Sequence, residues 1–304
     1  MTIETAGSLD SVKVDGREPL SADSHTPEEQ GPRTAPTRSD RLRERTLDLL
    51  ELAWRPAAVI VALFLAWWLV TAQQWVASYL IPRPADVWNT MVVSREFLWS
   101  NALVTIYETV AGFVIAAFGG IVIAVWIVYS RNVEKSLYPL LVFAQVIPKV
   151  AIAPLFVIWL GFGSAPKILV AVLVAFFPIV VSTIAGLRSI DPDLLDLAAT
   201  MGSSRWKTFR KIRFPASLPH VFSGLKVAAT LAVIGAVVGE FVGANEGIGY
   251  VLLNANGNLN TPMLYAGLVI LSAIGIVVFM TIELAERILV PWQPSRRASV
   301  SVTA

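Results

Sequence analysis

Two long runs without any charged residue constrain what this chain can fold into. Residues 56–82 and 109–130 contain no Asp, Glu, Lys or Arg. About 20 apolar residues in a helix cross the hydrocarbon core of a bilayer. The whole chain is 55% hydrophobic and 15% charged, whereas soluble domains carry about 25% charge. We therefore expect a multi-pass protein of the inner (plasma) membrane.

Six apolar segments predict an all-α, polytopic membrane fold. The expected spans are about 57–75, 102–129, 136–159, 168–187, 227–242 and 263–282. The third contains Pro148, Lys149 and Pro154. Two prolines free backbone groups within one span, which suits a bend beside a cavity.

The distribution of Lys and Arg predicts the orientation of the spans. With the N-terminus inside, the inner segments 41–55, 130–135, 188–226 and 287–297 hold sixteen Lys and Arg residues, against three in the outer segments. Cytoplasmic loops carry an excess of these residues. Six spans with both termini in the cytoplasm satisfy this rule, and five spans would place the C-terminal Arg residues outside.

The first 48 residues predict a disordered cytoplasmic tail, followed by a transmembrane domain over 49–300. The tail is rich in Ser, Thr, Pro and charged residues and has no aromatic residue up to position 46, so it buries too little apolar surface to fold. It lacks the apolar run of a signal peptide and is expected to stay attached. Between the first two spans, residues 85–99 predict either a helix on the outer membrane surface or a simple connecting loop.

The residue inventory excludes several kinds of chemistry. The chain has no cysteine, and its only histidines are His25 and His220. Disulfides, thiolate metal sites and histidine-based metal clusters are therefore not expected. No Gly-x4-Gly-Lys-Ser/Thr loop is present to bind ATP phosphates. We expect neither an enzyme nor a cofactor in this chain.

The inner loop within 188–222 is the most informative segment. Asp191 is a good N-cap, Pro192 suits the first helical turn, and Gly202 is placed to end that helix. A basic stretch follows, and Pro215 is expected to stop it. The first helix has an apolar face formed by Leu194, Leu195, Ala198 and Met201, and the second one formed by Trp206, Phe209 and Ile212. This pattern predicts two short amphipathic helices that either dock into a groove on a partner protein or lie on lipid headgroups.

The spacing of this loop resembles the signature of binding-protein-dependent ABC importer permeases. That signature is Glu-Ala-Ala, three residues, Gly, nine residues, Ile, one residue and Leu-Pro. The matching positions are Asp196, Leu197, Ala198, Gly202, Ile212, Phe214 and Pro215. Asp, Leu and Phe replace Glu, Ala and Leu, which are changes of similar character. The resemblance implies that these residues, with Ala199, contact the ATPase subunit as a coupling helix.

Two further segments are similar to the nitrate, sulfonate and taurine branch of this family. They are residues 148–163, in the third span, and the turn at residues 80–84. The resemblance covers about residues 80–290. It implies an ATP-driven importer in which separate subunits bind ATP and Mg²⁺, an extracytoplasmic protein binds the solute, and a second permease copy completes the pathway by alternating access. Membrane lipid is an expected partner, and nucleic acid is not.

Intramembrane polar residues are candidates for the pathway, because charge inside a membrane is costly. Lys149 could attract an anionic solute, or it could pair with Glu240 or Glu108. Gln145 lies one turn before Lys149, and Glu240 is expected near the outer end of the fifth span. Glu108 is expected close to the outer surface, where a structural role is favoured.

Two other classes of protein remain as alternatives. A secondary transporter or channel without an ATPase would leave the patterned inner loop unexplained. A membrane enzyme has no support from any cluster of His or carboxylate residues within a span. The substrate stays open among nitrate, sulfonates, taurine, larger organic anions and vitamin precursors.

Overall fold

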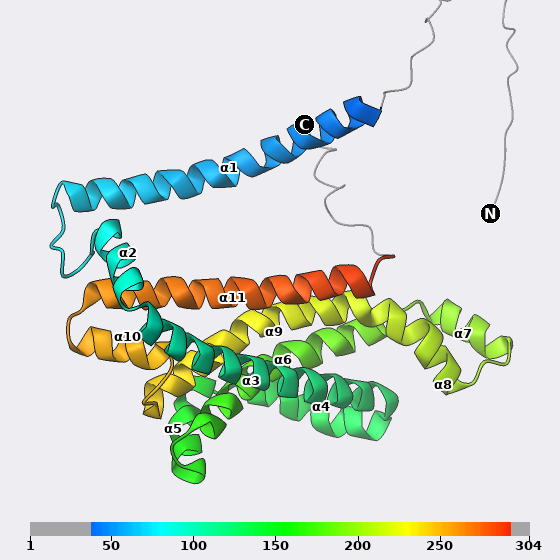
Figure 1. The fold of residues 1–304 in the computed structure, drawn as a ribbon. Coiled ribbons are helices and arrows are strands. Elements are labelled where there is room, and N and C mark those ends of the chain that lie inside the picture. Colours follow the sequence, from blue (N-terminus) through cyan, green and yellow to red (C-terminus); the bar gives the residue numbers. More distant parts are fainter. Residues whose placement is uncertain (1–37, 293–304) are drawn as a thin grey trace, which may run out of the picture. The chain divides into compact units, whose positions relative to one another are not determined.

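The computed structural model describes residues 38–292, and their side chains from Trp54 onward. The predicted tail falls largely outside this range. The described residues form two compact units, one ending at Val61 and one beginning at Ala62. The first is a helical stretch, and the second contains the remaining helices. Figure 1 traces both.

All regular structure in the described part of the chain is helical. A π-helical turn, η1 (Phe209–Arg213), lies between α8 and α9. The α-helices are α1 (Arg38–Ala72), α2 (Pro84–Val93), α3 (Arg95–Tyr129), α4 (Arg131–Val146), α5 (Lys149–Leu160), α6 (Ser164–Arg188), α7 (Pro192–Thr200), α8 (Arg205–Thr208), α9 (Phe214–Gly243), α10 (Ile248–Gly257) and α11 (Thr261–Leu289). Five helices are long and apolar enough to cross a membrane, and the bent pair α4–α5 makes six. The predicted all-α fold and span count are confirmed, while the orientation of the termini stays a prediction.

Three segments add to the sequence-based expectation or differ from it. Helix α1 begins at Arg38, before the expected boundary at residue 48, because this stretch is rich in the good helix formers Arg, Leu and Glu. Of the two alternatives for residues 85–99 the helix is confirmed, since they form α2 and the start of α3. Helix α10 includes Asn254 and Asn256, while Asn258 and Asn260 lie in the turn that leads to α11.

The third span is divided by a sharp bend. Helices α4 and α5 meet at an angle of 97°. Ile147 and Pro148 have extended backbones, with ψ angles of 127° and 95°. A residue before proline avoids the helical region, and proline has no N–H to continue the ladder. The expected bend is confirmed, and it is sharp enough to turn α5 away from α4.

Small residues bring α3, α6 and α9 into close contact at the centre of the bundle. A Cβ added to Gly235 of α9 would lie 2.6 Å from the Cα of Ala171 in α6. A Cβ on Gly120 of α3 would lie 3.0 Å from Ile179 of α6. The core between them is largely alanine, including the fully buried Ala175 and Ala232. Membrane helices associate through such close backbone packing, since lipid tails are as apolar as their side chains.

Candidate functional site

The inner loop folds as a helical hairpin, formed by α7, α8 and η1. The Asp191 carboxylate accepts a hydrogen bond from the backbone N–H of Asp193 at 3.0 Å and so caps α7. The helix ends at Gly202, whose φ of +74° favours glycine. The N–H groups of Gly202 and Ser203 donate to the carbonyls of Ala199 and Ala198, each at 3.0 Å. The predicted start and stop of this helix are confirmed.

The second arm of the hairpin does not stop at Pro215, contrary to expectation. Helix α8, η1 and α9 form one continuous helical segment from Arg205 to Gly243. The N–H of Phe214 donates to the carbonyl of Phe209, five residues earlier, which is the wider π spacing. Pro215 falls in the first turn of α9, and this local widening lets the segment continue without the missing N–H. The hairpin is therefore joined directly to the fifth span.

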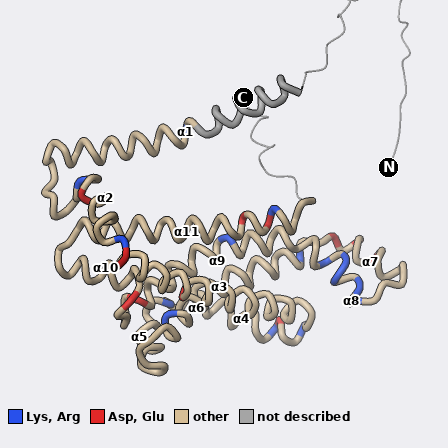
Figure 2. Tube along the Cα trace, viewed as in Figure 1, with Lys and Arg blue, Asp and Glu red and all other residues tan. Residues whose placement is uncertain are grey.

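Apolar side chains of the hairpin face solvent. Leu197 is 57% exposed and Met201 is 79% exposed, and Leu194 lies on the same face of α7 at helical spacing. Trp206 at the start of α8 is also exposed. Exposed apolar groups clustered in this way mark interaction sites. Figure 2 shows the basic residues of the hairpin gathered beside them at α8.

The predicted coupling residues divide between this surface and the hairpin interior. Asp196, Leu197, Ala199 and Gly202 are exposed. Ala198 is buried, while Ile212 and Pro215 are partly buried. The exposed apolar face is thus Leu194, Leu197 and Met201, whereas the expected set contained Ala198. Ala198 is 7% exposed, and its backbone carbonyl accepts the bond from Ser203 that closes the helix.

Phe209 anchors the hairpin to the membrane bundle. Its ring lies 5.2 Å from Tyr129 at the end of α3, in an edge-to-face arrangement. It stacks on Trp206 at 5.6 Å and lies 5.8 Å from Phe214. The sequence pattern places Phe209 on an apolar face but does not indicate its partner, because Tyr129 is eighty residues away along the chain. This cluster puts the hairpin in contact with α3 as well as α9.

Lys149 lies at the first residue of α5, at the bend of the third span. Its ammonium lies 4.8 Å from the ring centroid of Phe177 and 3.3 Å from the Gln145 carbonyl. Within the described residues it forms no ion pair, so the expected pairing with Glu240 or Glu108 is wrong. The two carboxylates have other partners, because Glu108 bonds Lys167 and Glu240 bonds Thr105.

Glu108 and Glu240 belong to a separate buried network. Glu108 accepts from the ammonium of Lys167 at 2.7 Å, with the two residues 0% and 5% exposed. This pair supports the structural role that was favoured for Glu108, while its depth in the membrane stays a prediction. Helix α3 begins at Arg95, earlier than the span predicted from residue 102, so Glu108 lies about 20 Å along the helix. Glu240 is also buried and bonds Thr105 at 2.7 Å.

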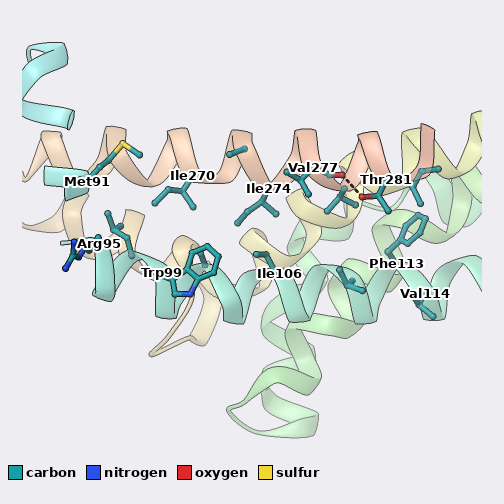
Figure 3. A pocket seen from close by; sticks show the side chains of 16 residues that line it. Met91, Arg95, Trp99, Ile106, Phe113, Val114, Ile270, Ile274, Val277 and Thr281 are labelled. Atoms are coloured by element: carbon teal, nitrogen blue, oxygen red, sulfur yellow. Dashed lines mark hydrogen bonds between the residues drawn. The ribbon is translucent and has the colours of Figure 1, made fainter. Parts of the chain in front are cut away.

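A groove of about 690 Å³ runs between α3 and α11 (Figure 3). Its lining is almost wholly apolar, including Trp99, Ile106 and Ile274, and Arg95 at one end is its single charged member. Neither Gln145, Lys149 nor Glu240 lines it. A polar solute would gain nothing from such a surface, so this groove suits lipid or an apolar helix better than a transport pathway.

Comparison with known proteins places these features in a family. Residues 116–293 match the family described as binding-protein-dependent transport system inner membrane component. A probable ABC transporter permease protein of Haemophilus influenzae is 36% identical over 75% of this chain and 94% of its own length. The formylaminopyrimidine transport permease protein of Halalkalibacterium halodurans is 37% identical over 74% of this chain and 91% of its own length.

Two other similarities bear on the branch and the fold. A putative aliphatic sulfonates transport permease protein of Bacillus subtilis is 30% identical over 80% of this chain and 89% of its own length. The MetNI methionine ABC transporter has a chain of similar fold, with a TM-score of 0.54, 18% identity, and coverage of 66% of this chain and 98% of that chain. This chain therefore belongs to the binding-protein-dependent inner membrane components, as a multi-pass permease of an ABC importer in the nitrate, sulfonate and taurine branch.

Proposed function

We propose that this permease passes a small anionic solute from an extracytoplasmic binding protein to the cytoplasm, driven by a separate ATPase that binds ATP and Mg²⁺. The family implies both the ATPase and the binding protein as partners. Two copies of the chain pair around a common pathway and alternate between outward-open and inward-open states. A sulfonate is the first candidate solute, and a formylaminopyrimidine is the second, following the names of the relatives.

The exposed apolar face of the hairpin carries the ATPase assignment. Leu197 and Met201 cannot remain in water without cost, and a groove on a partner would cover them. The surrounding Arg and Lys residues then lie at the rim, where charges guide docking and specificity. Because α8 continues into α9, a displaced hairpin would move the fifth span directly.

Lys149 is the residue that we assign to the pathway. An ammonium within the third span without a carboxylate partner is costly unless it faces water or an anion. The face of Phe177 offsets only part of that cost. A passing sulfonate would supply the missing negative charge, and Gln145 on the preceding turn would add a polar contact.

Leu197→Asp tests the hairpin assignment. A charge at the centre of the apolar face should lower both the co-purified ATPase and the uptake of solute by at least tenfold. Asn132→Asp is the matched control, because it adds the same charge at an exposed position at the start of α4. Equal amounts of ATPase bound to both variants, in mild detergent, would refute the assignment.

Lys149→Gln and Lys149→Arg test the pathway assignment. In vesicles, Gln should lower uptake of a radiolabelled sulfonate at least tenfold with the ATPase still bound, whereas Arg should retain most of it. Formylaminopyrimidine, which carries no negative charge, is the comparison solute. Uptake of formylaminopyrimidine without uptake of sulfonate would identify the pyrimidine as the substrate. Unchanged sulfonate uptake by Lys149→Gln would refute the assignment of Lys149 to the pathway.

A further inference from the structure

Helix α10 is capped by side chains from two other helices. Its N-cap residue, Gly247, makes no side-chain capping bond of its own. A helix nevertheless leaves its first N–H groups without intrahelical partners. Three consecutive N–H groups here find acceptors on α3 and α9, namely Gly247 to Asn101 Oδ1 at 2.8 Å, Ile248 to Thr105 Oγ1 at 2.8 Å, and Gly249 to Glu240 Oε2 at 2.5 Å.

The three acceptors form one connected group, which we call the α10 clamp: Asn101, Thr105 and Glu240. Thr105 donates its hydroxyl to Glu240 Oε1 at 2.7 Å, so both carboxylate oxygens of Glu240 are bonded. Asn101 and Thr105 lie four residues apart, on one face of α3. None of the three is more than 6% exposed. Water therefore has little access to replace any bond that breaks.

The charged groups of this region lie close together, but each carboxylate has its own hydrogen-bond partners. Glu108 is paired with Lys167. Glu240 faces the N-terminus of α10, whose aligned N–H groups favour a negative charge. Withdrawal of α10 would leave the Glu240 carboxylate buried without its partner, which is strongly unfavourable. Helix α10 and the outer end of α9 are thus expected to stay together.

Two glycines make this contact possible. A Cβ on Gly249 would lie 2.6 Å from Glu240 Oε2 and 3.0 Å from the carbonyl of Val237. A Cβ on Gly247 would overlap the Glu240 carboxylate, and Gly247 has a φ of +106°. Only a residue without a side chain allows the backbone to approach the carboxylate at these positions.

We propose that Asn101, Thr105 and Glu240 are positioning residues for transport, which fix α10 to the outer ends of α3 and α9 so that the three move as one body. The far end of α9 is continuous with the α7–α8 hairpin through a segment of 39 residues, about 58 Å long. When a binding protein contacts α10, the resulting displacement would pass along α9 to the hairpin and so to the ATPase. This proposal rests on the proposed function.

Thr105→Val is the first test, with Thr109→Val as its matched control. Both hydroxyls are fully buried on α3, but that of Thr109 has no hydrogen-bond partner among the described residues. In the complex purified with its ATPase, Thr105→Val should reduce the stimulation of ATP hydrolysis by the binding protein at least fivefold, with basal hydrolysis within twofold. Thr109→Val should change neither rate.

A labelling experiment tests the clamp without relying on transport. The chain has no cysteine, and Ala255 of α10 is 5% exposed. Ala255→Cys should react with a water-soluble maleimide at least ten times faster beside Thr105→Val than beside Thr109→Val. Asn101→Ala removes the bond from the Gly247 N–H and should also raise the labelling rate of Ala255→Cys. It replaces Thr105→Val in this experiment if that variant does not assemble.

The two readouts separate the clamp from the proposed function. Faster labelling with no sulfonate uptake by the unmodified complex would uphold the clamp and reject the proposed solute. Unchanged labelling in both Thr105→Val and Asn101→Ala would overturn the clamp. Normal stimulation of ATP hydrolysis despite faster labelling would overturn its role in transport.

Discussion

Replacement of Lys167 by methionine tests the buried ion pair most directly. Methionine keeps the length and apolar stem of the side chain but removes the ammonium that lies 2.7 Å from Glu108 Oε1. The second oxygen of Glu108 already has no partner among the described residues. The substitution would therefore leave a carboxylate that is fully shielded from solvent without any compensating charge.

The expected loss of stability is large. Removal of one member of a buried ion pair costs about 3–5 kcal/mol, because the remaining charge is desolvated. For a domain of 150–250 residues, about 2–4 °C in Tm accompanies each kcal/mol, so the Tm should fall by roughly 10 °C. The double variant Glu108→Gln with Lys167→Met removes both charges and should recover most of this loss.

Lys226→Met is the matched control for this experiment. Lys226 also bridges two helices, since it bonds Glu283 at 2.9 Å and Glu286 at 2.5 Å. Its side chain is 22% exposed, so the remaining carboxylates can be hydrated and the loss should be about 1 kcal/mol. Thermal unfolding in detergent, followed by tryptophan fluorescence, measures all four proteins. Equal losses in Lys167→Met and Lys226→Met, or no recovery in the double variant, would refute the reasoning.

Two further predictions concern glycines. Gly202→Asp should abolish uptake while membrane insertion stays normal. The positive φ is strained for a residue with a side chain, and the new charge lies in the coupling hairpin. Uptake at the wild-type rate would contradict the coupling role. Gly235→Ala should destabilise the protein by about 1–3 kcal/mol, since its Cβ would lie 2.6 Å from the backbone of Ala171. Gly275→Ala, where a Cβ meets nothing within 4 Å, should not lower the Tm, because alanine favours the helix interior over glycine, and it serves as the control.

The amino-acid sequence determined the features that depend on local pattern. The long apolar runs specified the spans, Asp191 and Gly202 specified the limits of α7, and the proline at 148 specified the bend of the third span. Each of these follows from interactions within a few residues, such as capping bonds, backbone dihedrals and the length of an apolar helix. The spacing of the coupling signature likewise identified the family before any tertiary contact was known.

The tertiary structure alone decided which polar residues meet. Glu108 pairs with Lys167, Glu240 caps α10, and Lys149 lies over Phe177, whereas the sequence suggested that Lys149 might pair with one of the two glutamates. It also decided that α10 is a helix and that the segment from Arg205 continues past Pro215. The physical reason is that partners 59 and 135 residues apart in sequence are brought together by the packing of small residues between helices, and no local pattern encodes that register.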